Sequence, residues 1–137
     1  MIDTDELDRI YPVPDDLSRI TEHNLAAVWR GFRDRGISRL ILVGVFADRP
    51  GELDWIARAV PGARFTLIRL VAPWATLEGR VGRREVGTGR AAQLERTASQ
   101  VAAMQTDQRR EVHLVETGGL SLPQAAGEVR RLWIGSP

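Results

Sequence analysis

Two short groups of charged residues have types and spacings that could support chemistry. The first is Asp3-Thr4-Asp5, close to the amino terminus. Paired carboxylates can hold Mg²⁺ through water or accept a proton from a hydroxyl group. The same residues also suit a helix N-cap, because aspartate and threonine side chains accept hydrogen bonds from the amides of a first turn. For so short a motif the capping interpretation is the more frequent one.

The second group consists of arginines on either side of a glycine-rich stretch at 85–90. Arg80 and Arg84 stand four residues apart and therefore project from one face of a helix, with Arg83 beside them and Arg90 beyond the glycines. Guanidinium groups bind phosphate oxygens at two points, and a glycine hinge lets such groups close over a ligand. The alternative is a solvated basic face near a helix C-terminus, where the helix dipole favours cations.

The size and composition of the chain are those of one globular domain. It has 137 residues, of which 43% are hydrophobic and 27% are charged. A domain of about 150 residues buries roughly 70% of the surface of its unfolded chain, so a core can form without disulfides or metals. We therefore expect a single domain over residues 1–137.

The same composition excludes several kinds of site and partner. Cysteine is absent, which rules out disulfides, thiol catalysis and cysteine-ligated zinc, and the absence of lysine rules out lysine amine chemistry by this chain alone. A net charge of +1 gives no strong attraction to nucleic acid or to an anionic membrane. No apolar run approaches the roughly 18 residues of a membrane span, and the acidic start does not resemble a signal peptide. We expect a soluble, cytoplasmic protein.

Strand and helix patterns alternate along the chain. Short apolar runs rich in branched residues predict strands at 39–46, 65–71 and 111–116, and continuous apolar runs are typical of strands covered on both faces. This order predicts an α/β fold of three layers, a parallel sheet with helices on both faces. The expected helices run from Asp15 or Asp16 to about Arg35 before Gly36, over 50–60, from Pro73, from Arg90 to about Met104, and over 121–133 after a capping box at Ser121 and Gln124.

Polar residues follow three of the predicted strand ends. They are 3–5 after the fragment Met1-Ile2, 44–48 at the end of the run at 39–46, and 117–119 after the run at 111–116. In an open parallel sheet, ligands bind beyond the carboxyl ends of the strands. We therefore expect the functional site at this edge.

Taken in order, these segments resemble the small P-loop kinases, which include shikimate kinase, gluconate kinase, adenylylsulfate kinase and chloramphenicol phosphotransferase. Asp3-Thr4-Asp5 resembles the acidic motif at the end of the second strand of that family, and 40–46 resembles its third strand. Residues 69–73 and the arginines after them resemble the fourth strand and a lid at about 80–92, and 115–120 resembles the fifth strand and the loop that borders adenine. The resemblance covers nearly the whole chain.

The resemblance implies ATP and Mg²⁺ as cofactors and phosphoryl transfer to a small-molecule hydroxyl acceptor. Asp5 would be the general base for the acceptor hydroxyl, and Asp3 would help to position the Mg²⁺ ion. Arg80 and Arg84 would clamp the transferring phosphates, with Arg83 as a substitute.

The resemblance also implies where the two substrates bind. Thr117 and Gly118 would line the adenine ring of the nucleotide. Gly44, Phe46 and Arg49 would face the acceptor pocket, because they lie at or just beyond the end of the segment that resembles the third strand, which leads into that pocket.

One essential part of the family pattern does not occur in these residues. The phosphate-binding loop G-x-x-x-x-G-K-[ST] is absent, and it follows the first strand of the family, which lies at the centre of the sheet order second, third, first, fourth, fifth. Segments 40–46 and 65–71 would therefore face an empty slot, in which each unpaired buried group costs on the order of 1–3 kcal/mol. The strands could pair directly, a second copy or a strand-supplying partner could fill the slot, or Met1 could lie inside a longer kinase; we expect the last.

Three functional hypotheses remain. The first is an ATP-dependent small-molecule kinase, inactive as these 137 residues without an upstream phosphate-binding loop. The second is a non-catalytic remnant of such a kinase that self-associates or binds a partner. The third is a haloacid-dehalogenase-type phosphatase, which is disfavoured because Leu7 stands where that motif has threonine or valine.

Overall fold

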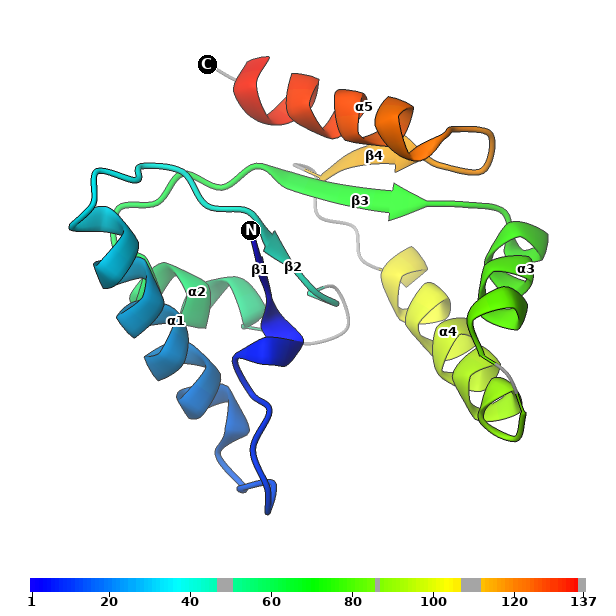
Figure 1. The fold of residues 1–137 in the computed structure, drawn as a ribbon, viewed down its shortest axis with the longest axis horizontal. Helices are drawn as coiled ribbons and strands as arrows, with labels where there is room; N and C mark the ends of the chain where they lie inside the picture. Colours follow the sequence, from blue (N-terminus) through cyan, green and yellow to red (C-terminus); the bar gives the residue numbers. More distant parts are fainter. Residues whose placement is uncertain (47–50, 86, 107–111, 136–137) are drawn as a thin grey trace. The chain divides into compact units, whose positions relative to one another are not determined.

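The computed structural model describes residues 1–46, 51–85, 87–106 and 112–135. Contacts divide the chain into two compact units, Met1–Ala63 and Arg64–Pro137 (Figure 1). Each unit contains one two-stranded parallel sheet, and five α-helices connect or cover the strands of the described residues. The α/β class and the parallel pairing are confirmed, whereas a single three-layer sheet stays a prediction.

The first unit is built on a very short sheet. Strand β1 pairs in parallel with β2, with Ile2 beside Leu42 and Asp3 beside Val43. A 3₁₀ turn, η1, follows β1 directly, and two helices complete the unit. The bounds are β1 (Ile2–Asp3), η1 (Thr4–Glu6), α1 (Leu17–Arg33), β2 (Leu42–Val43) and α2 (Glu52–Ala59).

Helix α1 forms because its apolar residues recur with the helical period and meet α2 on one face. Leu25 lies at the centre of this contact and is 0% exposed. The chain leaves the helix through Gly36, whose φ of +78° is a conformation that glycine adopts without strain. The predicted stop is therefore confirmed. The buried core of the unit consists of Leu7, Leu25, Trp55, Ile56, Ala59 and Val60.

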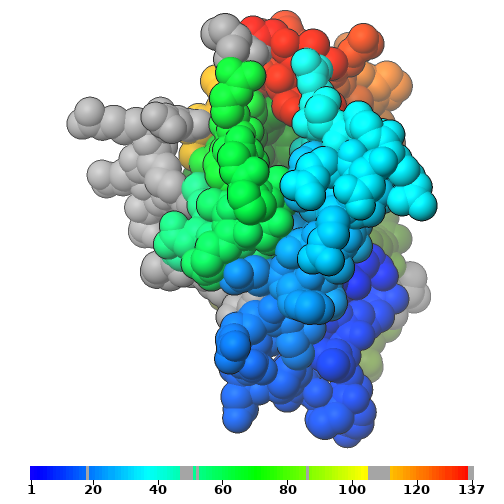
Figure 2. Space-filling model, turned by 90° about the vertical axis from the view of Figure 1, so that its left-hand side faces the viewer, coloured from blue at the N-terminus to red at the C-terminus, as the bar shows by residue number. Residues whose placement is uncertain are grey.

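The segment between α1 and β2 lies on the surface. Residues 32–39 are all exposed, and this part of the chain is drawn in cyan in Figure 2. The run at 39–46, predicted as a strand, contributes only Leu42–Val43 to a ladder. A strand is defined by backbone hydrogen bonds, and β1 offers only two residues to pair with. The predicted length was wrong for that reason.

The second unit has a longer sheet. Strand β3 pairs with β4 along five residues, from Leu67 beside Val112 to Val71 beside Glu116. Helix α5 lies along β4, and α3 packs against α4 (Figure 1). Arg69 donates a hydrogen bond of 2.7 Å from Nη1 to the carbonyl oxygen of Met104 and so connects β3 to α4. The bounds are β3 (Leu67–Val71), α3 (Trp74–Arg84), α4 (Gly89–Thr106), β4 (Val112–Glu116) and α5 (Leu122–Gly135).

Two helix starts in this unit follow the sequence signals. Pro73 occupies the N-cap position of α3, and its carbonyl oxygen accepts hydrogen bonds from the amides of Thr76 and Leu77. Before α5, the Gln124 side chain reaches back to Ser121, with Oε1 accepting from the Ser121 amide at 2.9 Å and from its hydroxyl at 2.8 Å. The Gln124 half of the predicted capping box is therefore confirmed, whereas the Ser121 hydroxyl donates to Gln124 instead of accepting from its amide.

Candidate functional site

The acidic motif forms the turn that follows β1. Asp3 is the N-cap of η1, and its Oδ1 atom accepts a hydrogen bond of 3.1 Å from the Asp5 amide. The capping interpretation is thus confirmed for Asp3. The side chains of Asp3 and Asp5 are both exposed at the end of the strand. Their oxygen atoms are hard donors of the kind that Mg²⁺ prefers, so the residues fit a magnesium ion held by one or two carboxylates and substrate phosphates.

Gly44 allows this motif to lie against the end of β2. The hydroxyl of Thr4 donates a hydrogen bond of 3.2 Å to the carbonyl oxygen of Val43. A Cβ atom on Gly44 would overlap Thr4 Oγ1 and would lie 3.2 Å from Cζ of Phe46. The structure therefore brings the acidic motif together with Gly44 and Phe46, two of the predicted acceptor residues. The third, Arg49, lies outside the described residues.

Sequence reasoning did not single out Asn24, which fixes the chain beyond the motif. The Nδ2 atom of Asn24 donates a hydrogen bond of 2.7 Å to the carbonyl oxygen of Leu7. Asn24 is half-buried in α1, beside the fully buried Leu25. The side-chain amide of Asn24 among the apolar positions of the helix was the sequence signal that could have identified this residue. This contact holds the acidic turn at the side of α1.

In the second unit, a predicted phosphate-clamp residue contacts a predicted adenine-lining residue. Arg80 of α3 donates from Nη1 to Thr117 Oγ1 at 3.0 Å and from Nη2 to the Thr117 carbonyl oxygen at 2.8 Å. Thr117 is only 6% exposed. Its hydroxyl donates to the carbonyl oxygen of Val71 at 3.0 Å, and its amide donates to the same oxygen at 2.7 Å. The guanidinium of Arg80 thus binds the turn that follows β4.

Gly118 occupies a position with no room for a side chain. A Cβ atom there would lie 2.8 Å from Cδ of Pro73 and 3.0 Å from Oε1 of Glu116. The Gly118 amide donates to that Glu116 oxygen at 2.8 Å. At Gly119, a Cβ atom would meet nothing within 4 Å. Pro73 and Glu116 therefore shape the predicted adenine turn, and sequence reasoning gave neither residue that role.

The remaining arginines lie on the surface of the hairpin formed by α3 and α4. Arg84 donates to the Glu85 carboxylate at 3.1 Å. The Arg83 side chain lies over Gly79, with its Nη1 atom 3.6 Å from where a Cβ atom of Gly79 would be. The Arg90 side chain lies over Gly82, with its Nη2 atom 3.1 Å from where a Cβ atom of Gly82 would be. Within the described ranges, no carboxylate pairs with Arg83 or Arg90.

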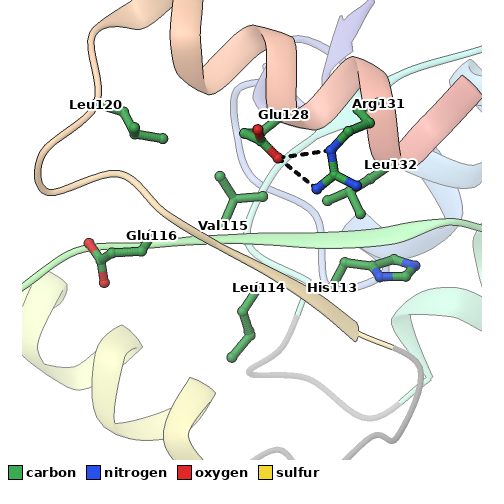
Figure 3. A pocket seen from close by; sticks show the side chains of 8 residues that line it. All are labelled: His113, Leu114, Val115, Glu116, Leu120, Glu128, Arg131 and Leu132. Atoms are coloured by element: carbon green, nitrogen blue, oxygen red, sulfur yellow. Dashed lines mark hydrogen bonds and ion pairs between the residues drawn. The ribbon is translucent and has the colours of Figure 1, made fainter. Parts of the chain in front are cut away.

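A shallow pocket of about 360 Å³ lies between β4 and α5, away from these residues (Figure 3). Val115 points toward α5, whereas Leu114 points to the opposite face of β4. Arg131 donates to the Glu128 carboxylate at 2.7 and 3.1 Å, which offsets its charge inside the pocket. The lining residues are His113, Leu114, Val115, Glu116, Leu120, Glu128, Arg131 and Leu132. None of the predicted site residues is among them.

Comparison of the chain with protein-family models, with curated proteins and with solved structures finds no match. In the part of the chain that the structure describes, no helix has the length and apolar character needed to cross a membrane. The same residues contain no group of three or more histidine, aspartate or glutamate side chains that could hold a metal ion. The candidate functional sites are therefore the turn after β1 and the turn after β4, with the residues around them.

Proposed function

We propose that this chain is part of an ATP-dependent kinase that transfers a phosphoryl group to a hydroxyl of a small molecule. The observation that carries the proposal is the pairing of the strands. Among the described residues, β1 pairs with β2 alone and β3 with β4 alone, in two separate sheets. The small P-loop kinases that the sequence resembles have their first strand between the third and the fourth. Two separate parallel pairs are what that order leaves when its central strand is absent.

Each strand of the two pairs has one edge without a ladder partner in the described residues, β2 and β3 among them. Val43 is 44% exposed and Leu70 is 57% exposed, although both belong to apolar runs typical of covered strands. We infer that the strand which separates the third and fourth strands in those kinases, and carries their phosphate-binding loop, comes from outside residues 1–137. An upstream segment of the same polypeptide is the preferred source.

The turn after β1 supplies the groups that the transfer step needs. Asp5 is exposed in η1, directly after Thr4, the residue that contacts Gly44, so an acceptor hydroxyl can reach its carboxylate. Asp5 accepts the proton of that hydroxyl as the general base. One oxygen of Asp3 already caps η1, so its other oxygen would be the one to help hold a magnesium ion. Such an ion, bound with ATP, would offset the charge that develops on the phosphates.

The hairpin of α3 and α4 supplies the cations. Both Nη groups of Arg80 are engaged by Thr117, so the clamp on the phosphates falls to Arg83 and Arg84. Arg83 has no carboxylate partner among the described residues, and the partner of the exposed Arg84 is its half-buried neighbour Glu85. An exposed ion pair of this kind contributes little, about 0–1 kcal/mol, so a phosphate can replace Glu85. The turn at Thr117 and Gly118 borders the adenine.

The test is calorimetric titration of Mg·ATP into the 137-residue chain and into a chain extended upstream in the same reading frame. We expect binding and phosphoryl transfer to hydroxyl acceptors in the extended chain, and no transfer by the shorter one. The control replaces the lysine of the added phosphate-binding loop by alanine, which removes transfer. A stop codon directly upstream of Met1, or an extended chain that neither binds ATP nor transfers phosphate, would overturn the proposal.

A non-catalytic module that self-associates is the alternative. The exposed apolar side chains of the β3 segment favour it, since Phe65 and Leu70 both lie open to solvent. Light scattering after size-exclusion chromatography separates the two proposals. The alternative expects a dimer of the 137-residue chain that Leu70→Glu converts to a monomer, with no nucleotide binding in either form.

A further inference from the structure

The turn at 117–119 is held by hydrogen bonds from several residues, and Arg80 donates two of them. We propose that Arg80 is a positioning residue: it fixes this turn on helix α3, so that the affinity for the nucleotide depends on Arg80 while the transfer step does not. This inference rests on the proposed function, because it takes the turn as the place where adenine binds. It assigns Arg80 a different role from the phosphate clamp that the resemblance implies.

The geometry of the contact requires an arginine. The two Nη atoms of Arg80 reach two different oxygens of one residue, Oγ1 and the carbonyl oxygen of Thr117, at 3.0 and 2.8 Å. A planar guanidinium presents its donors in a fixed fork, so the two bonds set the orientation of the turn as well as its distance from α3. A lysine ammonium is a single point of donation and cannot reproduce both bonds in that orientation.

Thr117 transmits this constraint to the sheet. Its hydroxyl accepts from Arg80 and donates to the carbonyl oxygen of Val71, at the last residue of β3. Its carbonyl oxygen also accepts from the amide of Leu120, at 3.4 Å, which closes the turn. Because Thr117 is buried, losing a partner leaves a polar group without water to replace it. Hydrogen bonds through Thr117 therefore connect Arg80 of α3 to Val71 of β3.

The other side of the turn is fixed independently of Arg80. The Gly118 amide is held by the Glu116 carboxylate, and Pro73 packs where a side chain would be. Helix α3 is itself anchored, since Val81, the neighbour of Arg80, is buried. Removing the Arg80 fork therefore loosens the turn without dissolving the helix or the ladder of β3 and β4.

The first test measures amide hydrogen exchange in the 137-residue chain and needs no catalysis. Arg80→Gln should speed exchange at the amides of Thr117 and Leu120 about five- to tenfold, while the Gly118 amide, which the Glu116 carboxylate holds, and the amides within β4 keep their rates. Arg80→Lys should restore part of the protection. Arg83→Gln is the matched control, a neighbouring arginine of the same helix without a described partner, and should match the wild type in this measurement.

Thr117→Val provides a second route if Arg80→Gln fails to fold, because valine keeps the volume and removes the hydroxyl that Arg80 contacts. It should speed exchange at the same two amides. Wild-type exchange rates at residue 117 and at Leu120 in either folded variant would overturn the inference. If instead the amides of β4 accelerate equally, Arg80 supports the whole unit and the positioning role is wrong.

The second test uses steady-state kinetics in the extended chain. Arg80→Gln should raise the KM for ATP about tenfold and leave kcat within about twofold, the pattern of lost ground-state binding. A fall in kcat with an unchanged KM would make Arg80 a phosphate clamp and would overturn the inference. If the extended chain transfers no phosphate, the proposed function is wrong. The exchange experiment still shows whether Arg80 positions the turn at 117–119.

Discussion

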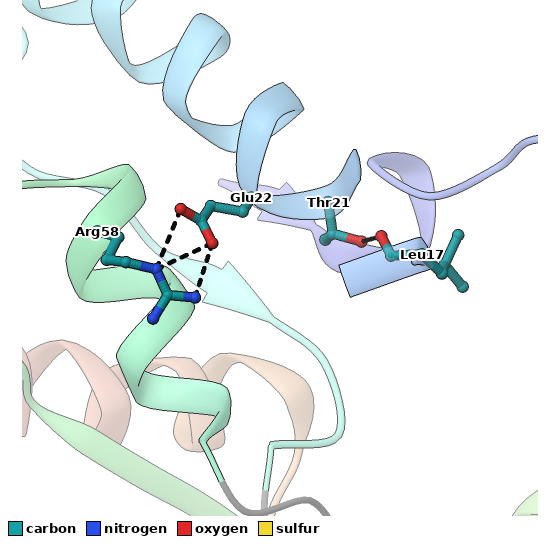
Figure 4. A network of polar contacts seen from close by, with 4 residues as sticks. All are labelled: Leu17, Thr21, Glu22 and Arg58. Carbon is teal, nitrogen blue, oxygen red and sulfur yellow. Dashed lines mark hydrogen bonds and ion pairs between the residues drawn. The ribbon is translucent and has the colours of Figure 1, made fainter. Parts of the chain in front are cut away.

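Glu22 of α1 and Arg58 of α2 form a two-point ion pair that joins the two helices of the first unit (Figure 4). The Arg58 Nε atom lies 3.2 Å from Glu22 Oε1 and 3.1 Å from Oε2, and Nη2 lies 2.8 Å from Oε2. The hydrogen bonds from Arg58 hold the pKa of the Glu22 carboxyl below its ordinary value of 4.5, although partial desolvation opposes the shift. The same bonds raise the pKa of Arg58.

This ion pair predicts a pH-dependent contribution to stability. The folded-state pKa of Glu22 lies below the unfolded value, so the contribution is fully present above that unfolded value and is lost as the pH falls through the folded pKa. Glu22→Gln should therefore lower the melting temperature at pH 7 and have no effect at pH values well below 4.5, where the wild-type carboxyl is also protonated.

Thermal unfolding followed by circular dichroism at both pH values measures this difference. Glu78→Gln is the control, since Glu78 is an exposed carboxylate of α3 without an ion-pair partner among the described residues. It should change the melting temperature equally little at both pH values. An equal loss for Glu22→Gln in acid and at neutral pH would show that the ion pair is not the cause.

Leu25 is predicted to be the most sensitive core position of the first unit. It is 0% exposed between α1 and α2. Leu25→Ala should lower the free energy of unfolding by about 2–5 kcal/mol, because it removes buried apolar contact and leaves a cavity. Urea unfolding measures the loss. Leu122→Ala is the matched control at a leucine that is 88% exposed, and it should change stability by less than about 0.5 kcal/mol.

The helices could be predicted from the sequence because their signals are local. The apolar period of α1 and the glycine at position 36 mark that helix within a few residues of its observed bounds. The contact between Ser121 and Gln124 at the start of α5 is likewise local, because the two residues are three positions apart in the sequence. Strands β3 and β4 also match their apolar runs, since each finds a partner of equal length.

The site could be predicted only as separate pieces. Arg80 and Thr117 were each singled out, but their contact joins residues 37 positions apart and depends on how α3 packs. The sequence left Asp3 open between a helix cap and a metal ligand. The structure shows the cap, because Asp3 is extended at ψ 129° and its carboxylate accepts from the Asp5 amide, whereas the role of Asp3 toward a metal stays a proposal. Such choices depend on tertiary geometry rather than on residue type.

Gly118 offers a direct test of the turn beside β4. Gly118→Ala should lower the free energy of unfolding by about 1–3 kcal/mol, because the added methyl would lie 2.8 Å from the rigid ring of Pro73. Gly119→Ala is the control at the adjacent position, where the added methyl meets nothing within 4 Å. Urea unfolding of both variants measures the contrast. Equal stability of the two would show that Pro73 does not close the space around Gly118.

Asp5 is the residue on which the proposed transfer step depends most. Asp5→Asn keeps the size of the side chain and removes its ability to take a proton, so turnover of the extended chain should fall about 10²- to 10⁴-fold. Affinity for ATP should be retained, and so should stability, since only the backbone amide of Asp5 takes part in a described hydrogen bond, to Asp3. Asp8→Asn, three residues further along, is the matched control and should keep normal turnover. Initial rates at saturating ATP measure the effect, and a near-normal rate for Asp5→Asn would place the base on another residue.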